Sequence, residues 1–199
     1  FIEEVASRSS APGGGSASAA IAAMGAGLGS MVAKLTLGVR KFEDLDAKMR
    51  KIAQPLHNAA KALIPMIDAD TNAFKDYVEA LRLPSGTKEE KKIKQERLQQ
   101  GLKKAIDVPL TTMKLADLAW DAMLGIAQYG NIASKSDVEV GAKAMETGIW
   151  GAYKNVLINL EDITDEKFKK ETTKLAKDIK NRAENQCKKV LRVLESRKP

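Results

Sequence analysis

Hydrophobic and polar residues along this chain recur at spacings of three and four, the period of an amphipathic α-helix. No stretch shows the strict alternation that is typical of a half-buried strand. Together with caps and prolines, the pattern predicts helices over residues 1–7, 16–37, 41–81, 88–106, 109–130, 136–160 and 164–195. We therefore expect an all-α bundle of long antiparallel helices joined by short connections. No interdomain linker interrupts it, so residues 1–199 are expected to form a single domain.

Capping residues mark where several of these helices begin. Thr87 and Glu90 have the spacing of a capping box, in which each side chain bonds to the other residue's backbone N–H. Ser136 and Glu139 have the same spacing and predict a second box, and Thr164 is expected to cap the last helix.

Prolines inside predicted helices mark points of strain. Pro55 and Pro65 fall within residues 41–81, and a proline in a helix interior costs about 3 kcal/mol. We expect a kink or break near Pro55. Pro109 is assigned to the first turn of its own helix, where its missing N–H carries no penalty.

The segment Pro12-Gly13-Gly14-Gly15-Ser16 cannot continue a helix, so the chain is expected to turn there. The helix that follows consists almost wholly of small residues, which lets its backbone approach a neighbour or a ligand closely. Backbone N–H groups at its start are expected to be free to meet an anion or an oxyanion. The apolar run over residues 17–33 is at the short limit for a membrane span, so buried packing is the better interpretation.

A carboxylate interrupts an apolar stripe in the third predicted helix. The positions that share this face follow at spacings of three and four: Leu63, Ile67, Asp70, Phe74, Tyr77 and Leu81. A carboxylate that faces a core must be hydrogen-bonded, paired or functional. Asp70 is therefore either a structural group, paired with a lysine or capping a neighbouring helix, or a functional acid. Asp68 points about 200° round the helix and is expected to be solvated.

Amides and a histidine are the other candidate polar groups. Asn155 and Asn159 end a second stripe, after Gly141, Met145, Gly148 and Ala152. These amides either satisfy loop backbone groups or recognise a polar heterocycle such as a pterin. His57 is either a packed, hydrogen-bonded histidine or a group that titrates near neutral pH. Further along, capping explains Ser136, whereas the roles of Asn131 and Asp137 stay open.

Charge and composition narrow the classes of function. The formal net charge is +7, but the lysines alternate with acidic residues, as on solvated helix faces, and no aromatic and basic cluster suggests nucleic-acid binding. A single cysteine, Cys187, excludes an internal disulfide and is interpreted as a bystander in a reducing compartment. With one histidine as well, a His/Cys metal site is not expected.

Several motifs together resemble the cyclodeaminase domain of the bifunctional, animal-type formimidoyltransferase-cyclodeaminases, over essentially the whole chain. They are Ala11-Pro12-Gly13-Gly14-Gly15-Ser16, Met31-Val32-Ala33, Asp68-Ala69-Asp70 with Phe74, Gly130-Asn131, Ser136-Asp137, Glu146-Thr147-Gly148, Gly151-Ala152-Tyr153 and Asn155-Val156-Leu157-Ile158-Asn159-Leu160. Shorter bacterial relatives with cyclohydrolase activity share the glycine motif.

The resemblance implies a dimeric all-helical lyase that converts 5-formimidoyltetrahydrofolate to 5,10-methenyltetrahydrofolate and releases ammonia, late in histidine breakdown. It implies that Asp70 is the catalytic acid and base and that tetrahydrofolate, as a polyglutamate, is the substrate, with no tightly bound cofactor or metal. It also implies a fused transferase domain and a cytoplasmic location, with association with the Golgi and intermediate filaments.

Substrate-binding roles are expected for residues of the glycine segment and for the polar residues discussed above: Pro12, Gly13, Gly14, Gly15, Ser16, His57, Asn131, Ser136, Asp137, Asn155 and Asn159. The alternatives are a methenyltetrahydrofolate cyclohydrolase that uses the same pocket, and a catalytically silent helical assembly module.

Overall fold

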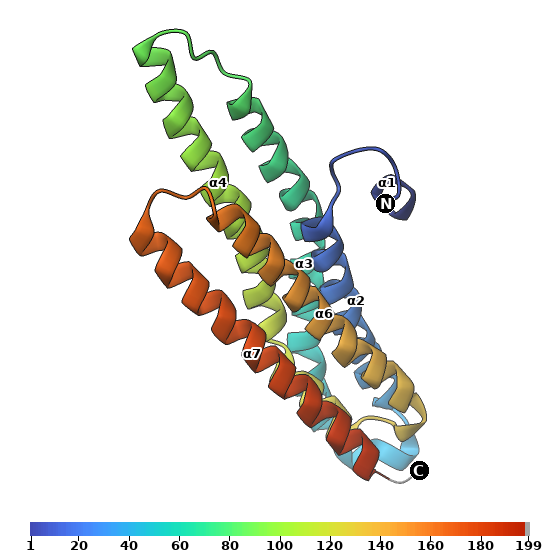
Figure 1. Cartoon of the computed structure of the whole chain (residues 1–199). Helices are drawn as coiled ribbons and strands as arrows, with labels where there is room; N and C mark the ends of the chain where they lie inside the picture. Colours follow the sequence, from blue (N-terminus) through green and yellow to red (C-terminus); the bar gives the residue numbers. More distant parts are fainter. Residues whose placement is uncertain (198–199) are drawn as a thin grey trace.

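The computed structural model describes residues 1–197, and within them it contains helices and no strand. Figure 1 shows long helices running roughly alongside one another, with a short N-terminal helix set off to one side. The α-helices are α1 (Ile2–Val5), α2 (Gly14–Thr36), α3 (Asp46–Leu81), α4 (Lys88–Asp117), α5 (Trp120–Tyr129), α6 (Lys135–Leu160) and α7 (Glu166–Ser196). Two 3₁₀ turns, η1 (Arg40–Leu45) and η2 (Ile132–Ser134), complete the described part of the chain. The predicted all-α class is confirmed.

Helix α2 packs between α3 and α6, and its small residues explain how closely it approaches them. A Cβ placed on Gly25 would lie 2.6 Å from the backbone oxygen of Gly141, and one on Gly148 would lie 2.7 Å from the Cβ of Ala22. Because real Cβ atoms essentially never approach so closely, larger residues at these positions would push α2 and α6 apart. The glycine and alanine stripes of the two helices therefore set the centre of the bundle.

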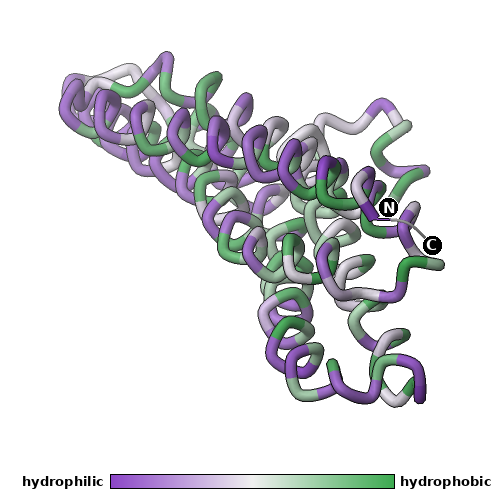
Figure 2. Tube along the Cα trace, turned by 90° about the horizontal axis from the view of Figure 1, so that it is seen from below, coloured by the Kyte–Doolittle hydropathy of each residue, from purple (hydrophilic) through white to green (hydrophobic). Residues whose placement is uncertain are grey.

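The apolar content of α2 belongs to this core. By length and composition α2 would pass as a membrane span, but 67% of its most apolar window is buried inside the bundle. Green and purple alternate along the helical turns in Figure 2, as expected when each helix of a bundle turns one face inward.

The prolines do not break the helices, so of the two outcomes predicted near Pro55 the break is wrong. Helix α3 is continuous through Pro55 and Pro65, and Pro109 lies within α4 instead of starting a helix. The predicted boundary before Pro109 is therefore wrong, and the chain instead leaves α4 at Leu118 and Ala119. Pro109 is buried, so burial of its ring offsets part of the cost of the lost hydrogen bond.

The predicted caps had mixed outcomes. The Thr87–Glu90 capping box is present with both of its hydrogen bonds. Ser136 lies inside α6, which begins at Lys135, so the second predicted box is wrong.

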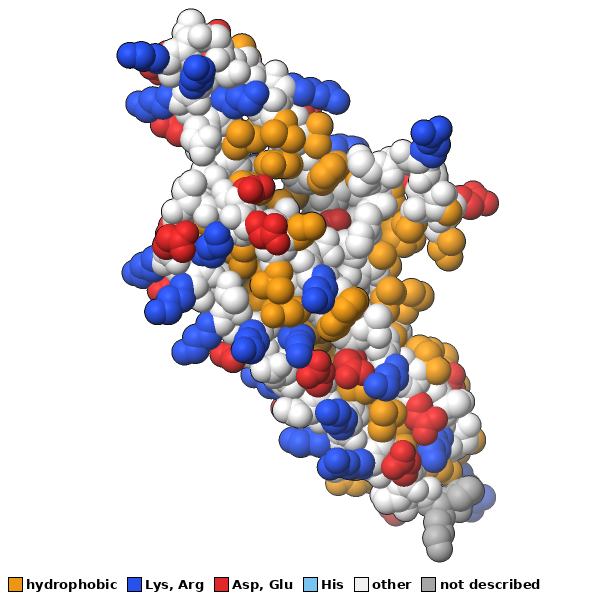
Figure 3. Space-filling view, viewed as in Figure 1, with side chains coloured by type: hydrophobic (Ala, Val, Ile, Leu, Met, Phe, Trp, Pro, Cys, Tyr) orange, Lys and Arg blue, Asp and Glu red, His pale blue; other side chains and the backbone are white. Residues whose placement is uncertain are grey.

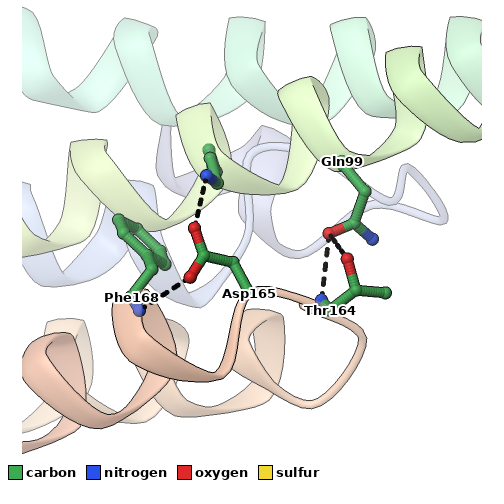
Figure 4. A network of polar contacts seen from close by, with 5 residues as sticks. Gln99, Thr164, Asp165 and Phe168 are labelled. Atoms are coloured by element: carbon green, nitrogen blue, oxygen red, sulfur yellow. Dashed lines mark hydrogen bonds and ion pairs between the residues drawn. The ribbon is translucent and has the colours of Figure 1, made fainter.

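Helix α7 is capped by Asp165 instead of Thr164, because the Asp165 carboxylate accepts a 3.0 Å hydrogen bond from the Phe168 N–H (Figure 4). Thr164 instead donates to Gln99 Oε1 of α4 through its backbone N–H and its hydroxyl, as Figure 4 shows. Asp165 thus fixes the start of α7 by capping that helix, and Thr164 fixes it by binding to α4.

The predicted apolar stripe of α3 is buried at its start and open at its end. Leu63 is fully buried, whereas Phe74 is 37% exposed and Leu81 is 45% exposed. Figure 1 shows the reason, since the end of α3 and the start of α4 extend past the other helices as a two-helix arm. Asp70 lies at the level where α2 begins, because it accepts a hydrogen bond from Ser16 in the first turn of that helix.

Candidate active site at the start of α2

The Asp70 carboxylate of α3 is held against the first turn of α2. Its Oδ2 accepts a 2.8 Å hydrogen bond from the backbone N–H of Ser16 and lies 2.9 Å from the Ser16 hydroxyl. Gly13, the residue at the N-cap position of α2, supplies no side-chain cap, so Asp70 caps the helix from a neighbouring element. One sequence-based alternative, a carboxylate that caps a neighbouring helix, is thus observed for Oδ2.

Capping does not account for the second oxygen of Asp70. Oδ1 accepts no hydrogen bond from any residue within 1–197. It lies where the side chain of residue 15 would be, because a Cβ on Gly15 would approach Oδ1 to 2.0 Å. The glycine at position 15 therefore makes room for the carboxylate, and Oδ1 is available to another group.

The Ser16 hydroxyl can serve Asp70 in either protonation state. Ser16 Oγ lies 2.8 Å from the carbonyl oxygen of Ile67 as well as 2.9 Å from Asp70 Oδ2. A hydroxyl has one proton and two lone pairs. It donates to Asp70 when the acid is ionised, and it can donate to Ile67 and accept from Asp70 when the acid is protonated. The site thus accommodates a carboxyl group that gains and loses a proton.

Burial favours the protonated form of this acid. Desolvation raises the pKa of Asp70 above the usual value for aspartate, and the hydrogen bonds from the Ser16 hydroxyl and backbone N–H oppose that rise without cancelling it. A half-buried carboxyl group with a raised pKa and one free oxygen has the properties of a general acid and base.

The two asparagines have different surroundings. A Cβ on Gly14 would lie 3.3 Å from Asn155 Nδ2, so this amide adjoins the glycine segment beside Asp70. Asn155 donates to the Gly151 carbonyl and leaves its amide oxygen without a donor among the described residues. Asn159 donates to the carbonyls of Asn155 and Ala105. The Asn159 amide therefore satisfies backbone carbonyls, as the structural alternative expected, but these carbonyls belong to helices α4 and α6 and not to loops. Asn155 is the amide beside the carboxylate.

The structure does not bring the other predicted residues to Asp70 within one chain. Asn131 caps η2 and donates its N–H to Thr36 Oγ1, at the far end of α2, which is about 34 Å long for its 23 residues. Ser136 and Asp137 follow Asn131 in the first turn of α6. His57 lines a separate hollow with Lys34 and Leu35. Within one chain these residues therefore lie away from Asp70, and their roles in substrate binding stay predictions.

Sequence reasoning missed two structural supports. Thr71 Oγ1 lies 3.2 Å from Ser16 Oγ and completes the polar cluster. Ser18 bonds to the Gly14 carbonyl, and a Cβ on Gly151 would lie within bonding distance of the Ser18 hydroxyl, so Gly151 is needed for that hydroxyl to fit. Because Thr71 follows Asp70 directly in the sequence, it could have been named as a member of the polar cluster. Nothing in the sequence pairs Ser18 with Gly151. Within residues 1–197 no three His, Cys, Asp or Glu side chains are grouped as a metal site.

Comparisons with known proteins converge on one family. The profile of a family described as formiminotransferase-cyclodeaminase matches residues 1–178. The formimidoyltransferase-cyclodeaminase of Dictyostelium discoideum is 52% identical over 198 residues, which are 100% of this chain and 36% of that protein. The protein of the same name from Gallus gallus is 46% identical over 197 residues, or 99% of this chain and again 36% of the relative.

Two further relatives have a length similar to that of this chain. A methenyltetrahydrofolate cyclohydrolase of Methylorubrum extorquens is 34% identical over 174 residues, covering 87% of this chain and 84% of that protein. The crystal structure of a formiminotetrahydrofolate cyclodeaminase from Thermotoga maritima superposes with a TM-score of 0.86 at 27% identity, covering 98% of this chain and 93% of the other.

Proposed function

Because this chain belongs to the formiminotransferase-cyclodeaminase family, we propose that it is a formimidoyltetrahydrofolate cyclodeaminase. In this reaction 5-formimidoyltetrahydrofolate closes to 5,10-methenyltetrahydrofolate and loses ammonia, which makes the enzyme an ammonia-lyase of histidine degradation. The observation that carries the proposal is the Asp70 carboxyl group, held by Ser16 with one oxygen free. The names of the relatives and of the superposed structure supply the reaction.

Asp70 is suited to both proton transfers that the reaction requires. N10 of the folate attacks the formimidoyl carbon and loses its proton, and the amine must gain a proton to leave as ammonia. One carboxyl group with a raised pKa can accept the first proton and deliver the second. Ser16 can follow each change of protonation by switching between Asp70 and the Ile67 carbonyl. The ionised carboxylate also stabilises the positive charge that develops in the methenyl product.

The neighbouring groups have positioning roles in this proposal. The glycines at the start of α2 let the folate approach Asp70 without side chains in the way. Asn155, which adjoins Gly14 and has a free amide oxygen, is proposed to orient the pterin. The surplus of lysines, part of a net charge of +7, would attract a polyglutamate tail.

A cyclohydrolase is the second candidate function, because a named cyclohydrolase is 34% identical over most of both chains. In that reaction water attacks the methenyl carbon in the same pocket, and Asp70 would serve as the base. The higher identity to the bifunctional proteins, 52% and 46%, favours the cyclodeaminase.

Assaying the purified chain on both substrates tests the proposal. We expect ammonia release from 5-formimidoyltetrahydrofolate, coupled to the appearance of the methenyl product. Turnover of 5,10-methenyltetrahydrofolate alone would replace the proposal by the cyclohydrolase. If neither substrate reacts and no folate raises the melting temperature, the chain is a silent assembly module.

We further propose that this unit is fused to a transferase unit in the full-length protein, because it spans 36% of the length of the bifunctional relatives. We propose a cytoplasmic location with Golgi and intermediate-filament association on the family resemblance alone. Assembly into at least a dimer is also proposed, and the small-residue helices suit close subunit contact.

A further inference from the structure

Phe74 is an exposed aromatic residue one helical turn beyond the candidate acid. It follows Asp70 by four residues in α3, so the two side chains share one face of this helix and are offset by about 6 Å along its axis. Helical periodicity places Phe74 on a core-facing stripe, yet the residue is 37% exposed. Figure 3 shows hydrophobic side chains gathered where the two-helix arm leaves the bundle. Single exposed hydrophobic residues are ordinary, but an aromatic ring beside a candidate acid indicates a role in binding.

Helix α2 covers α3 and α6 only as far as the level of Asp70. The first turn of α2 bonds to Asp70 through Ser16, and the glycines of the same turn adjoin the Asn155 amide. Helices α3 and α6 both run antiparallel to α2, because later residues of α2 lie against earlier residues of both. The next turn of each helix therefore lies beyond the start of α2, and it carries Phe74 in α3 and Asn159 in α6.

The free oxygen of Asp70 lies on the side where α2 begins. Oδ2 is held by the N–H and the hydroxyl of Ser16. Oδ1 lies against Gly15, one residue nearer the start of α2, because a Cβ there would approach it to 2.0 Å. A ligand that reaches Oδ1 from this end of α2 therefore has Phe74 of α3 and Asn155 of α6 as its nearest side chains beyond the acid.

We propose that Phe74 contacts the aminobenzoyl ring of the folate and thereby fixes the direction in which the substrate lies. This inference rests on the proposed function for the identity of the ligand. In that reaction N10 must come within hydrogen-bonding distance of Asp70, and N10 is bonded directly to the aminobenzoyl ring. Interacting aromatic rings have centroids about 4.5–7 Å apart, a span that matches the offset of about 6 Å between Asp70 and Phe74.

The two neighbouring side chains suit opposite halves of the folate. The pterin carries N–H donors, and the amide oxygen of Asn155 has no donor among the described residues. The Phe74 ring has no polar atom, which suits the benzoyl ring. The opposite orientation would place the polar pterin against Phe74 and leave the half-buried Asn155 oxygen without a donor.

This orientation also determines where the glutamate end of the folate lies. With the pterin at Asn155 and the benzoyl ring at Phe74, the carboxamide and the glutamate extend along the two-helix arm. Lys and Arg outnumber Asp and Glu over residues 75–104 of this arm. The arm therefore favours an anionic tail in the direction that Phe74 sets.

Binding of a stable folate and of its pterin half tests the contact without any need for turnover. 5-Formyltetrahydrofolate is close in shape to the substrate but has no amine to lose, and 6-methyltetrahydropterin lacks the aminobenzoyl ring. We expect Phe74→Ala to weaken binding of 5-formyltetrahydrofolate about tenfold in isothermal titration calorimetry. The Kd of 6-methyltetrahydropterin should stay the same within the error of the titration, because this ligand does not reach Phe74. Equal weakening of both ligands, or of neither, would overturn the proposed contact.

Two matched variants show whether the effect belongs to the ring of residue 74. Phe74→Tyr keeps the ring, so it should bind 5-formyltetrahydrofolate almost as tightly as the wild type. Leu81→Ala removes an exposed hydrophobic side chain from the same stripe of α3, but seven residues farther on, about 10 Å away along the helix. It should leave the Kd unchanged. A Leu81→Ala variant that lost as much affinity as Phe74→Ala would show a general effect of the arm and would contradict the specific contact.

Steady-state constants separate this contact from proton transfer. The benzoyl ring meets Phe74 both in the bound substrate and in the transition state, so loss of the contact raises KM and changes kcat little. We expect Phe74→Ala to raise KM for 5-formimidoyltetrahydrofolate about tenfold, whereas Asp70→Asn lowers kcat. A normal KM in Phe74→Ala would count against the proposal.

These measurements distinguish the inference from the proposed function. If Phe74→Ala selectively weakened binding of 5-formyltetrahydrofolate but the wild-type chain released no ammonia from its substrate, the function would be refuted and the contact would stand. If the wild type were active and Phe74→Ala bound and turned over folate normally, the contact would be refuted and the function would stand.

Discussion

Gly15→Ala tests the contact between the glycine segment and the candidate acid. The added Cβ would lie 2.0 Å from Asp70 Oδ1 and 2.5 Å from its Cγ, so the carboxyl group must move by about 1 Å or more to reach an ordinary contact distance. Such a shift breaks the hydrogen bonds from the Ser16 N–H and hydroxyl, each worth about 1.5–3 kcal/mol when the acceptor is charged.

Two effects reduce the net loss of stability. Alanine is favoured over glycine in a helix by about 1 kcal/mol. Asp70 is half-buried, so water can replace part of the lost hydrogen bonding. We expect a net destabilisation of about 2 kcal/mol, which lowers the melting temperature by about 4–8 °C in a chain of this size. Displacement of a catalytic group by about 1 Å is expected to lower kcat by about 10²-fold.

Gly14→Ala is the matched control for this prediction. It adds the same methyl group one residue earlier in the same helical turn, where the Cβ would lie 3.3 Å from Asn155 Nδ2. A flexible amide can yield by a few tenths of an ångström, so we expect the melting temperature to change by less than about 2 °C. Thermal denaturation and steady-state assays on both variants provide the comparison. If Gly15→Ala matched Gly14→Ala in stability and in kcat, the close approach of Gly15 to Asp70 would have no functional meaning.

Three further predictions concern pH, the substrate tail and His57. Burial raises the pKa of Asp70, so the folded chain holds this proton more tightly than the unfolded chain and loses stability as the pH rises through that pKa. The melting temperature of Asp70→Asn should therefore rise relative to that of the wild type as the pH increases from about 4, the usual pKa of aspartate, and a difference that does not change with pH would contradict this reasoning. Polyglutamylated folate should bind more tightly than the monoglutamate, and the difference in affinity should shrink with added salt, because exposed charges are screened over about 10 Å at 0.1 M. If the two forms bound with equal affinity at both low and high salt, attraction by the lysines would be refuted. His57→Gln should keep measurable turnover, because Asp70 remains the acid, and a loss as complete as that of Asp70→Asn would show otherwise.

The sequence was sufficient to predict the fold class and most helices, because helical periodicity and local caps are short-range signals. The capping box at Thr87 depends on residues three apart and was predicted correctly. The helix boundary near Pro109 was predicted wrongly, because α4 continues through this residue. Burial of the proline ring, which offsets part of the cost, depends on tertiary packing and cannot be seen in the local sequence. In the same way Asp165 displaced Thr164 as a cap, because Gln99 of another helix engages the threonine.

The candidate site shows the same division between local and long-range signals. Periodicity identified Asp70 as a carboxylate on an otherwise apolar stripe, and the glycine segment was recognised as a close-approach element. That Ser16 and Asp70 would bond to each other was beyond periodicity, because 54 residues separate them. Nor could periodicity show that Asn131, Ser136 and Asp137 lie at the other end of the bundle from Asp70, because that distance is set by the packing of α2 against α6.

The kcat of Asp70→Asn with 5-formimidoyltetrahydrofolate tests the central claim most directly. Asparagine keeps the shape of the side chain and can accept the hydrogen bonds from Ser16, but it cannot carry the proton. The account predicts an intact fold by circular dichroism, folate binding that changes little, and a kcat lower by about 10²-fold or more. Asp68→Asn, on the exposed side of the same helix, should be far milder. Near-normal kcat in Asp70→Asn, or a loss of activity that simply follows unfolding, would show that Asp70 is a structural cap and that another group transfers the proton.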